Sequence, residues 1–126
     1  MTAKVPAFTN EEKLDMLRRV TAHISNVEIG FFDGLLVNYV QQMGAQVIIK
    51  GLRAVSDFEY ELQMALMNQK QQPGIETLFM MTSSDNSFLS SSIVKEVARL
   101  GGNLNGMVPE MIIPDITKKL LDKGDH

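Results

Sequence analysis

The stretch IIKGLR places two cations, Lys50 and Arg53, at the end of an apolar run, with Gly51 between them. Two cations at the carboxyl end of a strand suit a phosphate, which arginine can bind through two parallel hydrogen bonds. A glycine at this point lets the backbone come close to a ligand. The alternative is two solvated cations, one of them paired with Asp57 or Glu59, because such surface pairs are common and weak. The residues alone favour that alternative.

Three consecutive serines, Ser90, Ser91 and Ser92, directly precede a pattern that is typical of an amphipathic helix. The N-terminus of a helix presents unpaired N–H groups and about half a positive charge. Serine hydroxyls add further donors, so this turn could bind an anion. The alternative is that Ser90 or Ser91 is a simple N-cap. The stretch by itself leaves both interpretations open.

A third candidate lies on the helix expected over residues 56–70, which carries Tyr60 and Glu61 in its first turns and Asn68 nearer its end. A carboxylate beside a bound nucleotide could accept hydrogen bonds from ribose hydroxyls. The alternatives are a solvated Glu61 near a helix start and a half-buried packing aromatic at Tyr60. Each alternative is favoured when its residue is taken singly. His23 has no neighbours at metal-ligand or triad spacing, so we predict no metal site.

The apolar pattern predicts the elements that must position these residues. Thr9 and Glu12 form a capping box at the start of the first helix. Strands that alternate with helices predict an α/β fold with right-handed βαβ units and a parallel sheet. Ligands of such sheets bind beyond the carboxyl ends of the strands. We expect helices over residues 8–24, 34–44, 56–70, 91–102 and 114–124, and strands over residues 26–32, 45–51 and 75–81.

Length and composition narrow the class of protein. With 126 residues, 44% of them hydrophobic and 21% charged, the chain is expected to form one globular domain over residues 1–126. A net charge of −3 provides no basic field for nucleic acid. The sequence has no cysteine, no apolar run long enough for a membrane span and no signal-peptide core. We therefore expect a soluble cytoplasmic protein without nucleic-acid or membrane partners.

The segments GLRAVSDFEYELQMALMN and SFLSSSIVKEVARLGG together resemble the phosphopantetheine adenylyltransferases, a bacterial family of the nucleotidylyltransferase superfamily. The likeness runs from about Lys4 to near Leu121. It implies a Rossmann-like, doubly wound parallel sheet and an enzyme that transfers the adenylyl group of ATP to 4′-phosphopantetheine. The products are dephospho-coenzyme A and pyrophosphate, in coenzyme A biosynthesis. The resemblance also implies Mg²⁺ with ATP, and a hexamer.

The resemblance assigns roles to the matching positions. The cations that it implies for positioning phosphates are Lys4, Lys50 and Arg53, and Lys50 stands where many members have arginine. The residues that it implies for binding 4′-phosphopantetheine are Lys4, Leu36, Lys50 and Asn68. The residues that it implies for contacting ATP are Gly51, Leu52, Arg53, Glu61, Asn86, Ser87, Phe88, Leu89, Ser90, Ser91 and Ser92.

One departure from the family pattern concerns catalysis. Members begin with a strand and a loop of the form PGSFDPxTxGH, whose histidine acts on the α-phosphate of ATP, followed by a helix and a second strand. No such motif occurs in this sequence. We therefore expect the first βαβ unit and the catalytic histidine to be missing, and a chain that is unstable or inactive alone, because its sheet loses a central strand. The alternative function is a catalytically inactive, truncated nucleotide-binding or assembly module.

Overall fold

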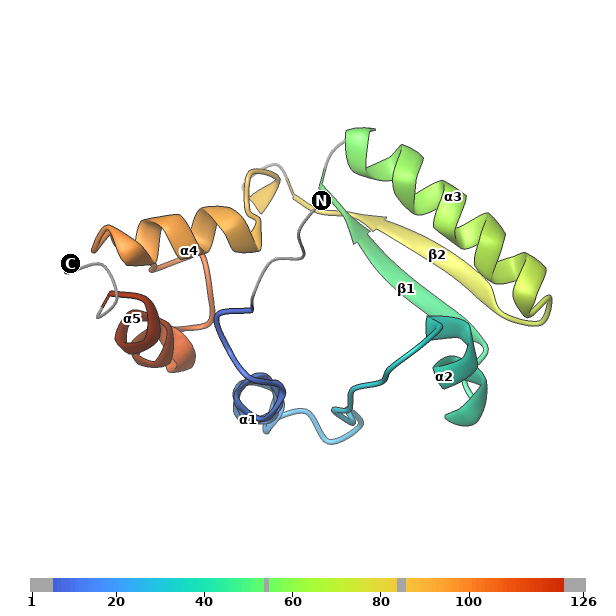
Figure 1. Cartoon of the computed structure of the whole chain (residues 1–126), viewed down its shortest axis with the longest axis horizontal. Helices are drawn as coiled ribbons and strands as arrows, with labels where there is room; N and C mark the ends of the chain where they lie inside the picture. The colour runs from blue at the N-terminus through green and yellow to red at the C-terminus, as the bar shows by residue number, and fades with distance from the viewer. Residues whose placement is uncertain (1–5, 54, 84–85, 122–126) are drawn as a thin grey trace. The chain divides into compact units, whose positions relative to one another are not determined.

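The computed structural model describes residues 6–53, 55–83 and 86–121 of the chain, without the side chains of residues 55 and 56. The chain divides into two compact units. The sheet unit is Phe32–Phe88, and the helical unit comprises Met1–Phe31 and Leu89–His126 (Figure 1). Each unit has an apolar cluster of its own. The single domain over residues 1–126 stays a prediction.

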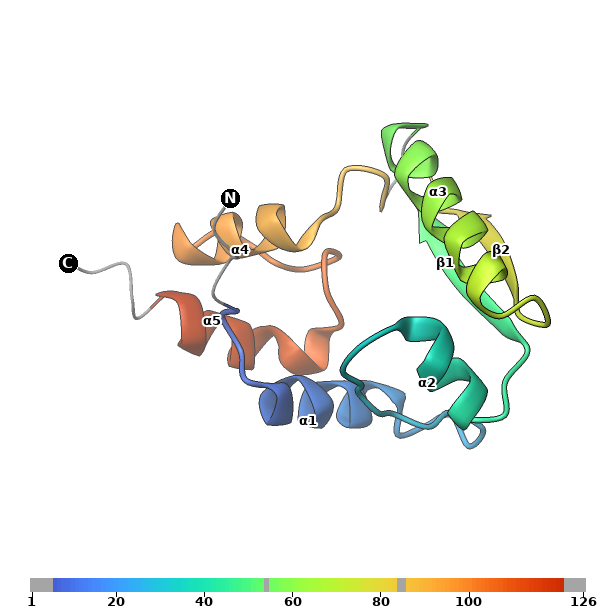
Figure 2. The ribbon, with the colours of Figure 1, turned by 45° about the vertical axis from the view of Figure 1, so that its right-hand side comes forward.

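The sheet unit is built around one βαβ motif. Strand β1 (Val47–Leu52) leads into helix α3 (Val55–Gln71), which leads back to strand β2 (Glu76–Met81). The two strands are parallel, and their register runs from Val47 beside Glu76 to Leu52 beside Met81. Helix α3 lies along the two strands (Figures 1 and 2). The predicted α/β fold with a parallel sheet is therefore confirmed.

The two faces of this sheet differ. On the face toward α3, the ring of Phe58 meets the ring of Phe79 edge to face, with 5.7 Å between centroids. Because side chains alternate along a strand, the opposite face carries Ile49, Leu78 and Met80. These three side chains are 64%, 55% and 63% exposed. Parallel sheets are normally covered on both faces, so within the described residues this sheet is covered on one face only.

Helix α2 (Leu36–Gln42) packs at the start of the two strands. Its buried residues Val37 and Val40 form a cluster with Ile48 of β1 and Ile75, which precedes β2. The turn before α2 contains Gly34 with φ +91°, a left-handed conformation that disfavours any other residue. This turn fixes where the chain enters α2, and hence one wall of the pocket described below.

The helical unit contains α1 (Asn10–Thr21), α4 (Ser91–Arg99), the short 3-10 helix η2 (Glu110–Ile112) and α5 (Ile113–Leu121). Its cluster is formed by Ala98 of α4, Leu104, and Ile116 and Leu120 of α5. Helix α1 begins with the predicted capping box, in which the side chains of Thr9 and Glu12 bond reciprocally to backbone N–H groups. Gly101, with φ +75°, follows the end of α4.

One predicted element is wrong. Residues 26–32 were expected to form a strand, but they form a turn and irregular backbone. Val27 and Phe31 in this stretch are exposed. A strand needs a neighbour that satisfies its N–H and C=O groups, and no described strand pairs with this segment. The predicted helices are present with ends shifted by a few residues. No helix in the described part of the chain is long and apolar enough to cross a membrane.

Candidate functional site

A pocket of about 320 Å³ in the sheet unit lies between the segment leading into α2, the middle of α3, and the strands. Its lining includes four residues to which the family resemblance assigns a role, Leu36, Lys50, Glu61 and Asn68. They come from α2, β1 and α3, so the fold brings together positions that are up to 32 residues apart in sequence (36 to 68). This pocket is the best candidate for a ligand site in the sheet unit.

The charged pair of the pocket is Lys50 and Glu61. The Nζ atom of Lys50 lies 3.2 Å from Oε2 of Glu61, which makes an ion pair. The orientation of the two groups does not meet hydrogen-bond geometry, so the buried Oε2 atom has no hydrogen-bond partner in the described part of the chain. The charge of Lys50 stabilises this oxygen, and a hydrogen-bond donor would stabilise it further. With its side chain 21% exposed and paired with Lys50, Glu61 is not the solvated residue considered as an alternative. The ATP contact that the resemblance implies for Glu61 stays a prediction.

The rest of the lining combines apolar walls with few polar groups. Leu36, Met64 and Ala65 supply apolar surface. Asn68, only 8% exposed, carries an amide that can both donate and accept hydrogen bonds. Such a lining is typical of a site for a small molecule with an extended, partly apolar body.

Tyr60 and Thr77 are two further residues of the lining that carry hydroxyl groups. Tyr60 was expected to be a half-buried packing aromatic, but its side chain is 62% exposed at the pocket. Thr77 also lines the pocket, and nothing singled it out. The signal that could have found Thr77 is the alternation of β2, which places it on the same face as Phe79 and therefore beneath α3.

Arg53 does not line this pocket. Its Nε atom bonds Oδ2 of Asp57 at 3.1 Å, and its Nη2 bonds Oδ1 at 3.4 Å. The alternative in which one cation pairs with Asp57 or Glu59 is therefore confirmed for Arg53. The guanidinium fork that could bind a phosphate holds a carboxylate in this structure.

The other residues of the GLR loop also differ from expectation. Lys50 and Gly51 were expected at or beyond the end of a strand, but β1 continues to Leu52. Leu52 is 2% exposed, so only its backbone can contact a ligand. A Cβ atom built on Gly51 would meet nothing within 4 Å. Glycine at this position therefore leaves free space above the strand and is not required by packing.

The serine turn lies in the helical unit. Ser90 is the N-cap of α4, and its Oγ accepts a hydrogen bond from the backbone N–H of Ile93 at 3.1 Å. The capping interpretation is thus confirmed for Ser90. Ser91 and Ser92 are exposed in the first turn of α4. An anion-binding role for this turn stays a prediction.

The remaining residues of the predicted ATP loop divide between the units. Asn86, Ser87 and Phe88 are exposed residues of the sheet unit, and the N–H of Asn86 donates to the carbonyl of Ser83 at 3.0 Å. Leu89 belongs to the helical unit. Lys4 lies outside the described residues.

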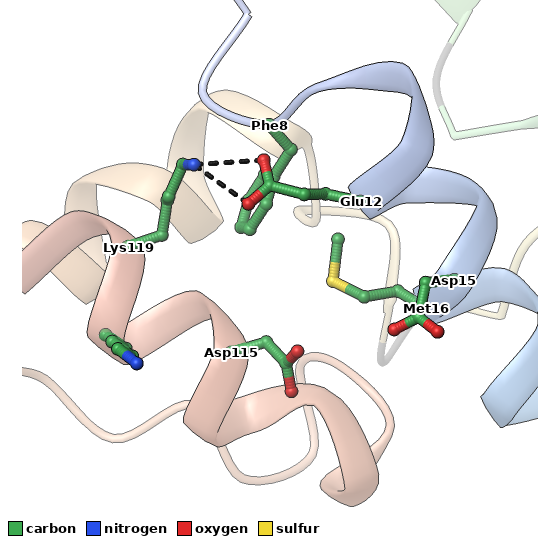
Figure 3. Close-up of a pocket in the computed structure, with 7 residues that line it drawn as sticks. Phe8, Glu12, Asp15, Met16, Asp115 and Lys119 are labelled. Atoms are coloured by element: carbon green, nitrogen blue, oxygen red, sulfur yellow. Dashed lines mark hydrogen bonds and ion pairs between the residues drawn. The ribbon is translucent and has the colours of Figure 1, made fainter.

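A second opening, of about 500 Å³, lies between α1 and α5 in the helical unit (Figure 3). Charged side chains at this opening form ion pairs with one another. Lys119 Nζ donates to both carboxylate oxygens of Glu12, at 2.9 and 3.0 Å. Arg19 donates to both oxygens of Asp115, at 3.2 and 2.6 Å. These pairs join two helices, and they leave no unsatisfied group comparable to Glu61 Oε2 in the described residues.

The same pairs shift protonation equilibria. The hydrogen bond from the backbone N–H of Thr9, together with the ammonium of Lys119, holds the pKa of Glu12 below its ordinary value. The guanidinium of Arg19 lowers the pKa of Asp115, and Asp115 in turn raises the pKa of Arg19. These shifts keep Glu12, Asp115 and Arg19 charged at neutral pH, which suits a structural role.

Comparisons with known proteins show the family of this chain. A family model described as cytidylyltransferase-like matches residues 2–97 and places the chain in the nucleotidyltransferase class. The phosphopantetheine adenylyltransferase of Clostridium botulinum (strain Alaska E43 / Type E3) is 54% identical over 112 residues, which are 89% of this chain and 70% of that protein. The chain belongs to the phosphopantetheine adenylyltransferase family.

Other relatives of the same name agree. The protein of Clostridium kluyveri is 56% identical over 112 residues, covering 89% of this chain and 68% of its own length. That of Caldanaerobacter subterraneus subsp. tengcongensis is 51% identical over 117 residues, covering 93% and 73%. The resemblance seen in the GLRAVSDFEYE and serine segments is therefore confirmed at the level of the family.

Proposed function

We propose that this chain belongs to an enzyme that transfers the adenylyl group of ATP to 4′-phosphopantetheine, giving dephospho-coenzyme A and pyrophosphate. A phosphate oxygen of 4′-phosphopantetheine forms the new bond to the α-phosphorus of ATP. The bond from the α-phosphorus to the bridging oxygen breaks, and its electron pair leaves with pyrophosphate. The observation that carries the proposal is one pocket that unites Leu36, Lys50 and Asn68, in a chain of this family.

The chemistry of the pocket fits the acceptor. 4′-Phosphopantetheine joins a phosphate to an arm with methyl groups, a hydroxyl and two amides. Lys50 supplies a cation for the phosphate, and Leu36 and Met64 supply apolar surface for the arm. The amide of Asn68 can pair with an amide of the arm. Burial of the arm and charge pairing at one end are together expected to favour a phosphorylated, extended ligand.

Contacts with ATP are assigned to Gly51 and Arg53 in the sheet unit and, separately, to the turn formed by Ser90, Ser91 and Ser92 in the helical unit. The phosphate-positioning role that the resemblance implies for Lys4 stays a prediction. The support is the chemistry of these residues, since a helix N-terminus and cations stabilise phosphate charge. Arg53 would exchange its carboxylate partner Asp57 for a phosphate. Catalysis of this kind depends on positioning and charge stabilisation, without a covalent intermediate.

Mg²⁺ enters the proposal only as the ion that accompanies ATP. The described residues contain no group of three side chains suited to hold a metal. Glu61 is the one carboxylate among the described residues that line the pocket. No step of the reaction is therefore derived through a metal bound by these residues.

Calorimetry on the full chain tests the proposal. We expect 4′-phosphopantetheine to bind more tightly than pantetheine, because only the former has a phosphate for Lys50. The Lys50→Met variant should remove this difference, whereas Lys70→Met, on an exposed lysine of the same unit, should keep it. Equal affinity for the two ligands in the unsubstituted chain would contradict the proposal. A subsequent assay of adenylyl transfer separates the enzyme, which turns over, from a module that only binds.

The hexamer and the cytoplasmic location implied by the family are part of the same proposal. Support for association comes from the exposed apolar face of the sheet, because such a face is stabilised when another surface covers it. Light scattering of the purified chain is expected to give a mass several times that of a monomer. A monomeric mass at micromolar concentration would contradict this part.

A further inference from the structure

The charge of the pocket in the sheet unit is balanced. Among the described residues that line it, Lys50 is the one cation and Glu61 the one carboxylate. Their Nζ and Oε2 atoms are 3.2 Å apart. An anion that approaches Lys50 is therefore also repelled by Glu61, which offsets part of the attraction. A bare polyanion gains less from entering this pocket than a ligand that also supplies a hydrogen-bond donor to Glu61.

The hydrogen-bonding state of Glu61 adds a second constraint. Its Oε2 atom is buried and has no hydrogen-bond partner in the described part of the chain. A buried carboxylate oxygen is stabilised by an N–H or O–H donor. A ligand that supplies such a donor relieves this cost, and a ligand that brings only acceptors increases it.

We propose that Glu61 is a specificity-determining residue that selects ligands in which a phosphate stands together with a hydrogen-bond donor. Glu61 engages Lys50 when the pocket is empty, and it accepts from the ligand when the pocket is filled. Polyphosphates without donors are excluded from the pocket by the same carboxylate. This inference rests on the proposed function, because 4′-phosphopantetheine combines a phosphate with a hydroxyl and two amide N–H groups. The role is additional to the ATP contact that the family resemblance implies for Glu61.

The selectivity ratio of the full chain tests this role. Calorimetry measures the affinity for 4′-phosphopantetheine, and competition measures the affinity of pyrophosphate for the same pocket. In Glu61→Gln, which keeps the size and an acceptor oxygen but removes the charge, pyrophosphate should compete about fivefold better. Binding of 4′-phosphopantetheine should weaken about twofold, so the ratio falls by about tenfold. Glu61→Asp keeps the negative charge but shortens the side chain by one methylene group. This variant should bind 4′-phosphopantetheine more weakly, while pyrophosphate stays excluded.

Glu59→Gln is the matched control. Glu59 is an exposed carboxylate of the same helix and does not line the pocket. Its substitution changes the net charge equally and should leave the ratio within about twofold, since exposed charges are screened. An unchanged ratio in Glu61→Gln, or an equal fall in Glu59→Gln, overturns the inference alone. If the unsubstituted chain binds no 4′-phosphopantetheine, the proposed function is contradicted and the inference falls with it.

Discussion

The two units contain the same kinds of ion pair, but the pairs serve different purposes. In the helical unit, Arg19 and Lys119 each donate two hydrogen bonds to a carboxylate on the facing helix. In the sheet unit, Lys50 and Glu61 touch at 3.2 Å without a hydrogen bond, at the edge of a pocket. The first arrangement satisfies its donors and acceptors, and the second leaves one unsatisfied. Incomplete hydrogen bonding in a concave site, rather than the presence of a charge pair, marks the place where a ligand is expected.

The variants with the largest expected effect test whether the stability of the sheet unit depends on its apolar core rather than on its ion pair. Leu52 is almost fully buried. Leu52→Ala should lower the free energy of unfolding by about 2–4 kcal/mol, because it removes buried methyl groups and leaves a cavity. Lys50→Met should change stability by less than about 1 kcal/mol, as expected for a partly exposed pair without a hydrogen bond. Urea denaturation measures both, and a larger loss in Lys50→Met would reverse the comparison.

The next effect concerns binding. Lys50→Met should weaken 4′-phosphopantetheine about tenfold, because a hydrogen bond to a charged group contributes about 1.5–3 kcal/mol, part of which Glu61 offsets. Lys119→Met, in the pair that joins α1 and α5, should leave this affinity unchanged. Titration calorimetry at constant ionic strength makes the measurement. Equal losses in both variants would show that the pocket pair acts through stability alone.

A smaller effect separates the two roles of the serine turn. Ser90→Ala should lower the free energy of unfolding by about 1 kcal/mol, because it removes the acceptor for the N–H of Ile93. Ser91→Ala should have little effect on stability, since Ser91 is an exposed residue of the first turn. Thermal unfolding followed by circular dichroism compares them. If Ser91→Ala weakens ATP binding while Ser90→Ala does so only through stability, the turn both caps a helix and binds an anion.

The smallest effect is the acid sensitivity of the helical unit. The pKa values of Glu12 and Asp115 are lowered in the folded chain from ordinary values of 4.5 and 3.8. Their contribution to stability is therefore present above about pH 4.5 and is lost as the pH falls through the folded pKa values. Arg19→Gln should flatten this loss, because it removes the main partner of Asp115. Urea midpoints between pH 5 and pH 3 measure it, and parallel curves for the two proteins would contradict the assignment.

Much of the fold follows from local sequence signals. The Thr9 and Glu12 capping box, the apolar run of β1 and the cap at Ser90 are each determined by residues close together in the chain, and the structure contains all three. The expected strand over residues 26–32 shows the limit of this reasoning. Alternating apolar residues suit a strand, but a strand also needs a neighbour, and the neighbour is a property of the whole fold.

The candidate site was less predictable from the residues alone than the fold was. Leu36, Lys50 and Asn68 were assigned by family resemblance, and the structure brings them into one pocket. The residues alone could not do so, because the wall that carries Leu36 depends on the left-handed turn at Gly34 and on stacking of Phe32 against Tyr39 at 5.1 Å. The partners of each cation were also unpredictable. Arg53 has a carboxylate four residues away, whereas Lys50 finds Glu61 only once α3 has packed on β1.

The capping residue Glu12 has a consequence for the order of assembly during synthesis. One oxygen of its carboxylate accepts both from the backbone N–H of Thr9 and from Lys119, which is 107 residues further along the chain. The first turn of α1 can therefore form as soon as it leaves the ribosome, but α1 has no buried residue to hold it in place. Its anchor arrives only when α5, at the other end of the chain, has been made. Until α5 has docked, α1 is expected to exchange between folded and frayed forms. In refolding of the complete chain, its amide protons should therefore be protected late in a pulse-labelling experiment.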